Sequence, residues 1–142
     1  MTNILPPYLA VRHFNEFDEW LEDAGAMVEN HPASAIYTAR MAAENALISL
    51  LTAQGFTSPS HKWIFHWMDQ CGNPDFTEIF ALGTQIILDD WRGRERELIA
   101  RTRQLGELVE RVIVQDPVVS VSVTRLRRMI SYVPANPSRD AD

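Results

Sequence analysis

The stretch YTARMAAENALISLLTAQGF, residues 37–56, decides the fold class of this protein. Its apolar side chains recur at intervals of three and four residues, the spacing that brings them to one face of a helix. Small alanines on that face would let a neighbouring helix approach closely. The pattern predicts a largely buried helix over about 33–54, with Gly55 as its stop and the following apolar stripe: Ile36, Ala39, Ala43, Ala46, Leu47, Leu50 and Leu51.

A pair of opposite charges, Arg40 and Glu44, lies one turn apart at the edge of this stripe. Burial of a charge is costly unless a partner or hydrogen bonds satisfy it, so the pair needs a structural or functional reason. We expect a structural clasp between helices or across a dimer. The alternative is a polar cleft, which His61 would join.

The segments before this helix predict its first packing partner. Residues 1–12 are expected to form an extended arm, because the adjacent Pro6 and Pro7 disfavour a helix there. Residues 14–30 combine apolar positions at helical spacing with an acidic opposite face. Since the turn over 30–34 is short, the two helices should form an antiparallel hairpin.

Further helices are expected in the second half of the chain. Gly93 and Gly106 leave open whether the longest of them is one helix or two, and Asp90 with Arg94 is one of the i,i+4 ion pairs expected on its solvent side. The length of 142 residues is typical of one domain. We therefore predict an all-α, single-domain bundle of four long helices plus a short one. Its later segments are a short helix over about 59–71, the long element over 75–115, a last helix over 120–133 and a flexible tail over 134–142.

The composition excludes several classes of protein. A net charge of −6 argues against a surface that binds nucleic acid over most of its area, which requires a basic face. Cys71 is the only cysteine, so no internal disulfide can form and a reducing compartment is expected. No run approaches the roughly 18 apolar residues of a membrane span, and no signal peptide is visible. We expect a cytoplasmic protein that has no membrane partner and, because phosphate-binding and dinucleotide-binding glycine patterns are missing, no cofactor.

The short helix carries His61, His66 and Asp69, residue types that bind metals. A spacing of five residues places the two histidines about 140° apart around a helix, so they cannot face one ion. No metal site is expected. The candidate catalytic residues, none of them a firm assignment, are Arg40, Glu44, His61 and His66.

The last predicted helix is basic, with Arg125, Arg127 and Arg128 and no acidic residue between them. Arginines near a helix N-terminus suit phosphate groups, so an RNA or nucleotide backbone is one candidate ligand. The same segment would also balance the acidic first helix, within the monomer or across a dimer. A third interpretation is contact with the acidic face of a partner protein.

Two surfaces are candidate protein interfaces. Trp63 and Trp67 form an i,i+4 pair that belongs either to the core, the default for tryptophan, or to an exposed aromatic patch. Such patches often dominate the energy of protein binding. Glu19 and Glu22 lie on the acidic face of the first helix, where a partner would meet negative charge.

The run from 35 to 61 has a wider pattern, in which a helix of the type A-R-x-A-x-E-x-A-L-x-x-L-L precedes a Gly-containing loop and a His that opens the next helix. This pattern resembles the opening of HEPN domains, small cytosolic helical bundles of prokaryotic toxin–antitoxin, antiviral and nucleotide-handling systems. The resemblance implies a dimer around the middle helices, with any RNA or nucleotide site in the cleft between them. The matching positions are Ala39, Arg40, Ala42, Glu44, Ala46, Leu47, Leu50, Leu51, Gly55 and His61.

The chain departs from that family at one important motif. HEPN ribonucleases resemble one another in an Arg followed, after four to six residues, by a His, and no arginine here has a histidine at that distance. We therefore expect a non-catalytic, HEPN-like interaction module that pairs with itself and with another protein, as a subunit or regulator in a toxin–antitoxin or antiviral complex. The alternatives are an RNA- or nucleotide-binding ribonuclease with a noncanonical site, and a small acidic inhibitor that blocks a macromolecular partner.

Overall fold

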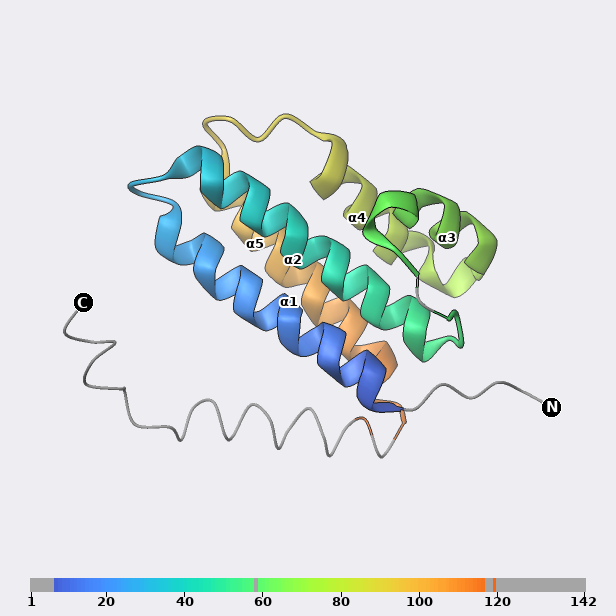
Figure 1. Cartoon of the computed structure of the whole chain (residues 1–142). Helices are drawn as coiled ribbons and strands as arrows, with labels where there is room; N and C mark the ends of the chain where they lie inside the picture. Colours follow the sequence, from blue (N-terminus) through green and yellow to red (C-terminus); the bar gives the residue numbers. More distant parts are fainter. Residues whose placement is uncertain (1–6, 58, 117–118, 120–142) are drawn as a thin grey trace, which may run out of the picture.

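A computed structural model describes residues 7–57, 59–116 and 119, and within this part of the chain the regular structure is entirely helical (Figure 1). The all-α prediction is confirmed. Two short 3-10 turns, η1 (His61–Trp63) and η2 (Pro74–Phe76), lead directly into α3 and α4. The α-helices are α1 (Pro7–Met27), α2 (Pro32–Ala53), α3 (Ile64–Cys71), α4 (Thr77–Leu88) and α5 (Glu95–Ile113).

Helix α2 is the centre of the bundle. It packs against α1, α3, α4 and α5, and α1 and α2 run antiparallel as the predicted hairpin (Figure 1). Its alanines Ala39, Ala42, Ala43 and Ala46 are fully buried, because small side chains allow neighbouring helices to approach closely. The register of the hairpin is fixed in part by Ser49, whose Oγ donates a hydrogen bond to the carbonyl oxygen of Ala10 at 2.8 Å.

The prediction of an extended arm over 1–12 is wrong for the part that the structure describes. Helix α1 begins at Pro7, seven residues before the predicted start at 14. Proline at the first helical position is favourable, because its missing N–H would have no partner there and its φ angle already suits a helix. The added turns bury Ala10 and Val11. Residues 1–6 lie outside the described residues.

The long element predicted over 75–115 is two helices, with a break between Leu88 and Glu95. Gly93 adopts a φ of 80°, in the left-handed region that favours glycine. The side chain of Trp91 is completely buried, and its Nε1 donates to the carbonyl oxygen of Ile86 at 2.9 Å. A buried tryptophan therefore anchors the turn that separates α4 from α5.

Gly106 has the opposite role, since α5 continues through it without interruption. A Cβ atom at this position would overlap the ring of Phe17 on α1. The glycine makes room for that ring, which is itself buried. The predicted last helix over 120–133 and the tail over 134–142 lie outside the described residues.

Candidate functional site

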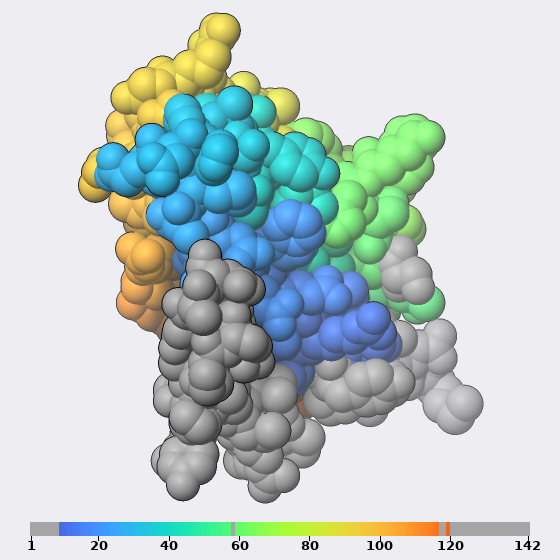
Figure 2. All heavy atoms as spheres, turned by 60° about the vertical axis from the view of Figure 1, so that its left-hand side comes forward, coloured from blue at the N-terminus to red at the C-terminus, as the bar shows by residue number. Residues whose placement is uncertain are grey.

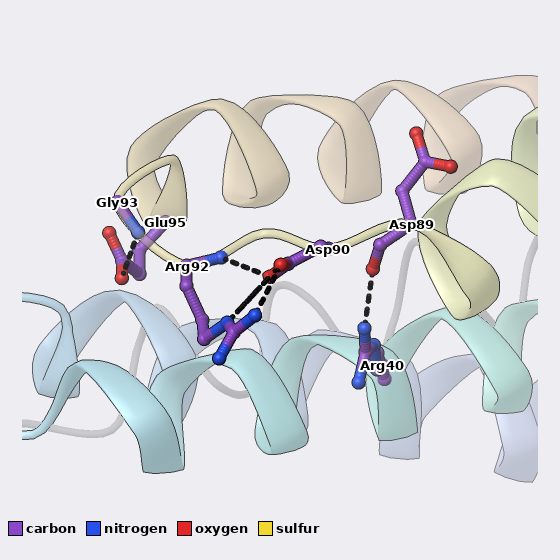
Figure 3. A network of polar contacts seen from close by, with 6 residues as sticks. All are labelled: Arg40, Asp89, Asp90, Arg92, Gly93 and Glu95. Carbon is purple, nitrogen blue, oxygen red and sulfur yellow. Dashed lines mark hydrogen bonds and ion pairs between the residues drawn. The ribbon is translucent and has the colours of Figure 1, made fainter.

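Arg40 and Glu44 are placed on the same side of α2, but each contacts a different neighbouring element. Arg40 Nη2 donates a hydrogen bond of 2.6 Å to the carbonyl oxygen of Asp89, in the turn between α4 and α5 (Figure 3). Glu44 Oε2 lies 3.6 Å from His61 Nδ1 on η1. Arg40 therefore joins two elements as a clasp would, although its partner is a backbone carbonyl.

The turn that Arg40 contacts contains an internal ion pair between Asp90 and Arg92. Asp90 accepts hydrogen bonds from the backbone N–H and the guanidinium of Arg92, with Arg92 Nη2 at 2.7 Å from Asp90 Oδ2 (Figure 3). Hydrogen bonding to the Arg92 side chain is the main reason why the pKa of Asp90 falls to about 2. The predicted Asp90–Arg94 pair is wrong, because α4 ends before Asp90 and Arg94 bonds to Glu97 at 3.1 Å.

A second histidine, His13 on α1, accompanies His61, and sequence reasoning missed it. His13 Nδ1 lies 3.8 Å from Glu16 Oε2. Desolvation by burial lowers the pKa of His13, the Glu16 carboxylate opposes this shift, and the positive charges of Arg12 and His61 add to it. The charge of His61 on η1 therefore acts on His13 of α1. We call Glu44, His61 and His13 the histidine cluster.

Each histidine of this cluster has one ring nitrogen that is shielded from solvent. The Nδ1 atoms of His13 and His61 are both buried and have no hydrogen-bond partner among the described residues. The Glu44 side chain is only 17% exposed. The contact between Glu44 and His61 joins a carboxylate of α2 to an imidazole of η1, and the electrostatic effect of His61 on His13 adds an imidazole of α1. This cluster is our polar candidate site in the described part of the chain.

His66 does not share this environment. It is exposed on α3, and its ring lies edge-on to that of Trp67, with ring centroids 5.1 Å apart. Within the described residues, no three side chains of the His, Cys, Asp or Glu type are grouped as metal ligands.

The strongest apolar candidate surface lies on η1 and α3. Trp63 is 58% exposed and Phe65 is 40% exposed, and Lys62 Nζ lies 5.4 Å from the centroid of the Trp63 ring. We call Lys62, Trp63 and Phe65 the aromatic face. In the space-filling view the green segment that contains it projects from the body of the molecule (Figure 2).

The two tryptophans proposed as a pair differ in their surroundings. Trp67 is half-buried and packs edge-on against Phe56, with ring centroids 6.2 Å apart, whereas Trp63 extends outward. A helical repeat of four residues cannot distinguish them, because η1 is a 3-10 turn and α3 begins only at Ile64. The aromatic patch therefore includes Phe65, and Trp67 belongs mainly to the core.

The acidic candidates Glu19 and Glu22 are exposed on α1. Glu19 Oε1 accepts a long hydrogen bond, 3.4 Å, from Asn15 Nδ2, and Glu22 is on the same helix one turn later. The basic candidates Arg125, Arg127 and Arg128 lie outside the described residues.

A cavity of about 360 Å³ lies elsewhere, between the end of α1 and the start of α5. Four of its five charged side chains form ion pairs, Arg96 with Glu29 and Arg94 with Glu97, and Glu95 accepts a hydrogen bond from the Gly93 N–H. Because these side chains already satisfy one another, the cavity offers little to an ionic ligand. Its lining is Val28, Glu29, Gly93, Arg94, Glu95, Arg96 and Glu97.

Comparison of the chain with protein-family models, curated proteins and solved structures gives no match. The HEPN resemblance therefore stays a prediction from the residues of α2 and the start of η1. None of the helices in the described ranges combines the length and apolar character that crossing a membrane requires.

Proposed function

We propose that this protein is a non-catalytic helical interaction module, which acts as a subunit or regulator in a larger complex and contacts its partner through the aromatic face. The observation that carries the proposal is the exposure of Trp63 and Phe65 on one short segment. Aromatic residues are enriched at the centres of protein interfaces, because they bury a large area with little loss of side-chain freedom.

The anchoring of α3 supports this role. Ile64 and Met68, one turn apart, are 2% and 7% exposed and fix one side of α3 in the core. Phe65 is therefore held on a helix that is packed into the core on another side, and Lys62 and Trp63 lie on the 3-10 turn that leads directly into this helix. A surface that is already ordered loses less entropy on binding than a flexible one.

The acidic residues of α1 supply a second element of recognition. Exposed carboxylates such as Glu19 and Glu22 attract a basic partner and discourage acidic ones, which affects the association rate and specificity more than affinity. The HEPN-like pattern of residues 35–61 adds homodimerisation and a toxin–antitoxin or antiviral complex to the proposal. These assignments rest on the resemblance alone.

Co-purification from the native host, with the tagged chain expressed at its natural level, tests the proposal. Wild-type protein should retain a stoichiometric partner, and the double variant Trp63→Ala, Phe65→Ala should lose it while its circular dichroism stays unchanged. Tyr37→Ala is the matched control, because Tyr37 is 62% exposed but lies on α2. Retention of the partner by the double variant would contradict the role of the aromatic face.

Charge reversal on α1 distinguishes the proposed interaction module from a small acidic inhibitor. If the protein blocks a macromolecule by presenting its acidic helix, Glu19→Lys with Glu22→Lys should abolish binding and the aromatic double variant should not.

An RNA- or nucleotide-directed function is the second candidate, and the histidine cluster is the observation that favours it. The expected signature is RNA cleavage, or a nucleotide-dependent rise in Tm, that disappears in both His13→Ala and His61→Ala. His66→Ala serves as the control, since His66 is exposed on α3. Activity that survives both substitutions would exclude the cluster as the site.

A further inference from the structure

One side of α1 carries an excess of negative charge, which we call the acidic face and define as Asp18, Glu19, Glu22 and Asp23. Glu22 and Asp23 follow Glu19 by three and four residues, the spacing at which like charges destabilise a helix. Both are exposed, and neither forms an ion pair within the described part of the chain. The last turn of α1 contains no basic residue. Positive charge from another segment would therefore stabilise this helix.

The end of α1 is open on its outer side. Gly25 is exposed, and a Cβ atom added there would meet no atom within 4 Å. The inner side of the helix is packed, since Ala24 is completely buried and the ring of Phe17 fills the space beside Gly106 of α5. The acidic face is thus an unpartnered helix face that another segment can reach.

The basic segment of the same chain begins within that reach. Helix α5 runs antiparallel to α1 and ends at Ile113, beside the start of α1 (Figure 1). Val119, six residues later, is buried in the hydrophobic core. The six residues from Val119 to Arg125 can span at most about 20 Å, and the twelve residues from Ala10 to Glu22 rise about 18 Å along a helix. The arginines can therefore meet the acidic face while the bundle stays intact.

The charge of this segment complements that of α1. Arg125, Arg127 and Arg128 lie in a stretch without any acidic residue between Asp116 and Asp140. A guanidinium can form two parallel hydrogen bonds to one carboxylate, which makes arginine well suited to an exposed acidic surface. The segment therefore supplies the charge that α1 lacks.

We propose that Arg125, Arg127 and Arg128 dock residues 120–133 on the acidic face of α1 in the same molecule. The contact offsets the repulsion among the carboxylates of α1. A basic partner that binds Glu19 and Glu22 must then displace the segment. This last consequence rests on the proposed function, whereas the docking is a property of the protein without its partner.

Limited trypsin digestion of the full-length chain without its partner tests the docking, because trypsin cleaves after arginine. Mass spectrometry measures how fast products that end at Arg125, Arg127 or Arg128 appear. This rate follows the fraction of molecules in which the segment is undocked. In a variant with the acidic face neutralised, the rate should rise about three- to ten-fold, the effect of losing two or three exposed ion pairs. The substitutions are Asp18→Asn, Glu19→Gln and Glu22→Gln.

A matched triple variant controls for the change in net charge. Asp69→Asn, Asp75→Asn and Glu78→Gln neutralise three exposed acids on α3, η2 and α4, and this protein should be cleaved at the wild-type rate. Cleavage that is equally fast, or equally slow, in wild type and both variants would overturn the contact with the acidic face. Protection that increases with protein concentration would overturn docking within one molecule.

Charge exchange tests the contact from both sides. One variant combines Arg125→Glu with Arg128→Glu, a second combines Glu19→Arg with Glu22→Arg, and a third has all four changes. Because the third restores the attraction, its Tm should lie about 2–4 °C above the value obtained by adding the two separate shifts. Shifts that simply add would show that the two groups do not touch.

Partner binding separates this proposal from the proposed function. If both are correct, replacement of Arg125, Arg127 and Arg128 by glutamine should lower the Kd of the co-purified partner several-fold. If the segment docks but the partner does not use the acidic face, the trypsin result will stand and the Kd will not change. If the segment does not dock, the aromatic double variant still decides the proposed function by itself.

Discussion

The turn between α4 and α5 and the η1–α3 segment are both short and irregular, yet they use their side chains in opposite ways. In the turn, Trp91 is buried with its N–H bonded, Asp90 is paired with Arg92, and Arg40 donates to the Asp89 carbonyl. In η1–α3, large aromatic side chains extend outward and His61 Nδ1 has no hydrogen-bond partner among the described residues. The turn buries its tryptophan and pairs Asp90 within the fold, whereas the segment exposes Trp63 and Phe65 to solvent.

The largest effect on the free energy of unfolding should come from Trp91→Ala. This variant tests whether the turn between α4 and α5 stabilises the fold. Removal of a completely buried tryptophan leaves a cavity and an unbonded Ile86 carbonyl, so the free energy of unfolding should fall by about 3–5 kcal/mol. Urea denaturation followed by circular dichroism measures this change. A loss of less than about 1 kcal/mol would show that the turn contributes little to stability.

Arg40→Met should have the next largest effect on stability. The substitution keeps much of the apolar stem but leaves the Asp89 carbonyl without its donor, at a cost of about 1–3 kcal/mol. The matched control is Arg92→Met, in the same turn but on the surface, which should leave the urea midpoint close to that of wild type. Equal effects of the two variants would contradict the assignment of Arg40 as the clasp.

Trp63→Ala and Phe65→Ala should be nearly neutral for stability, in contrast to Trp91→Ala. Substitutions at exposed positions usually change the free energy of unfolding by about 0.5 kcal/mol or less. Differential scanning calorimetry of the free protein should therefore give a Tm close to that of wild type. A large fall in Tm would show that the two rings stabilise the fold. It would contradict the contrast between the turn and the η1–α3 segment.

The smallest expected effect is on the pH dependence of stability, through the ion pair of Asp90 with Arg92 in the turn. The pKa of Asp90 in the folded protein is about 2, below its ordinary value of 3.8, because Arg92 stabilises the charged form. This contribution to stability is present above pH 3.8 and is lost as the pH falls through about 2. Asp90→Asn should slightly reduce the steepness of acid unfolding between pH 4 and pH 2, as followed by circular dichroism. A change in stability confined to neutral pH would contradict this origin.

Much of the fold could be predicted from helical periodicity. The boundaries of α2 were predicted as 33–54 and are Pro32–Ala53, because its stripe of alanines and leucines has a single period and a glycine at its end. Periodicity could not locate the break at residues 89–94. That break depends on burial of Trp91, which is a tertiary contact, in a stretch whose arginines and glutamates are also good helix formers.

The candidate site was predictable only in part. The sequence offered a polar cleft with His61 only as the alternative to a clasp of Arg40 and Glu44, and the structure places Glu44 Oε2 3.6 Å from His61 Nδ1. His13 is on another helix, and its approach to His61 depends on the register of the hairpin, which is fixed by contacts such as that between Ser49 and Ala10. The assumption of an extended arm over 1–12 also concealed it, since that arm ended immediately before His13.

The contact between Gly106 and Phe17 reverses a rule that protein engineers commonly apply. Intrinsic propensity ranks alanine above glycine in a helix interior by about 1 kcal/mol, so a consensus or propensity-guided design of α5 would replace Gly106 first. In this fold the added methyl group would meet the Phe17 ring and force α1 and α5 apart. A library that varies position 106 alone would be expected to return glycine, and a larger residue there would be recovered only together with a smaller one at position 17.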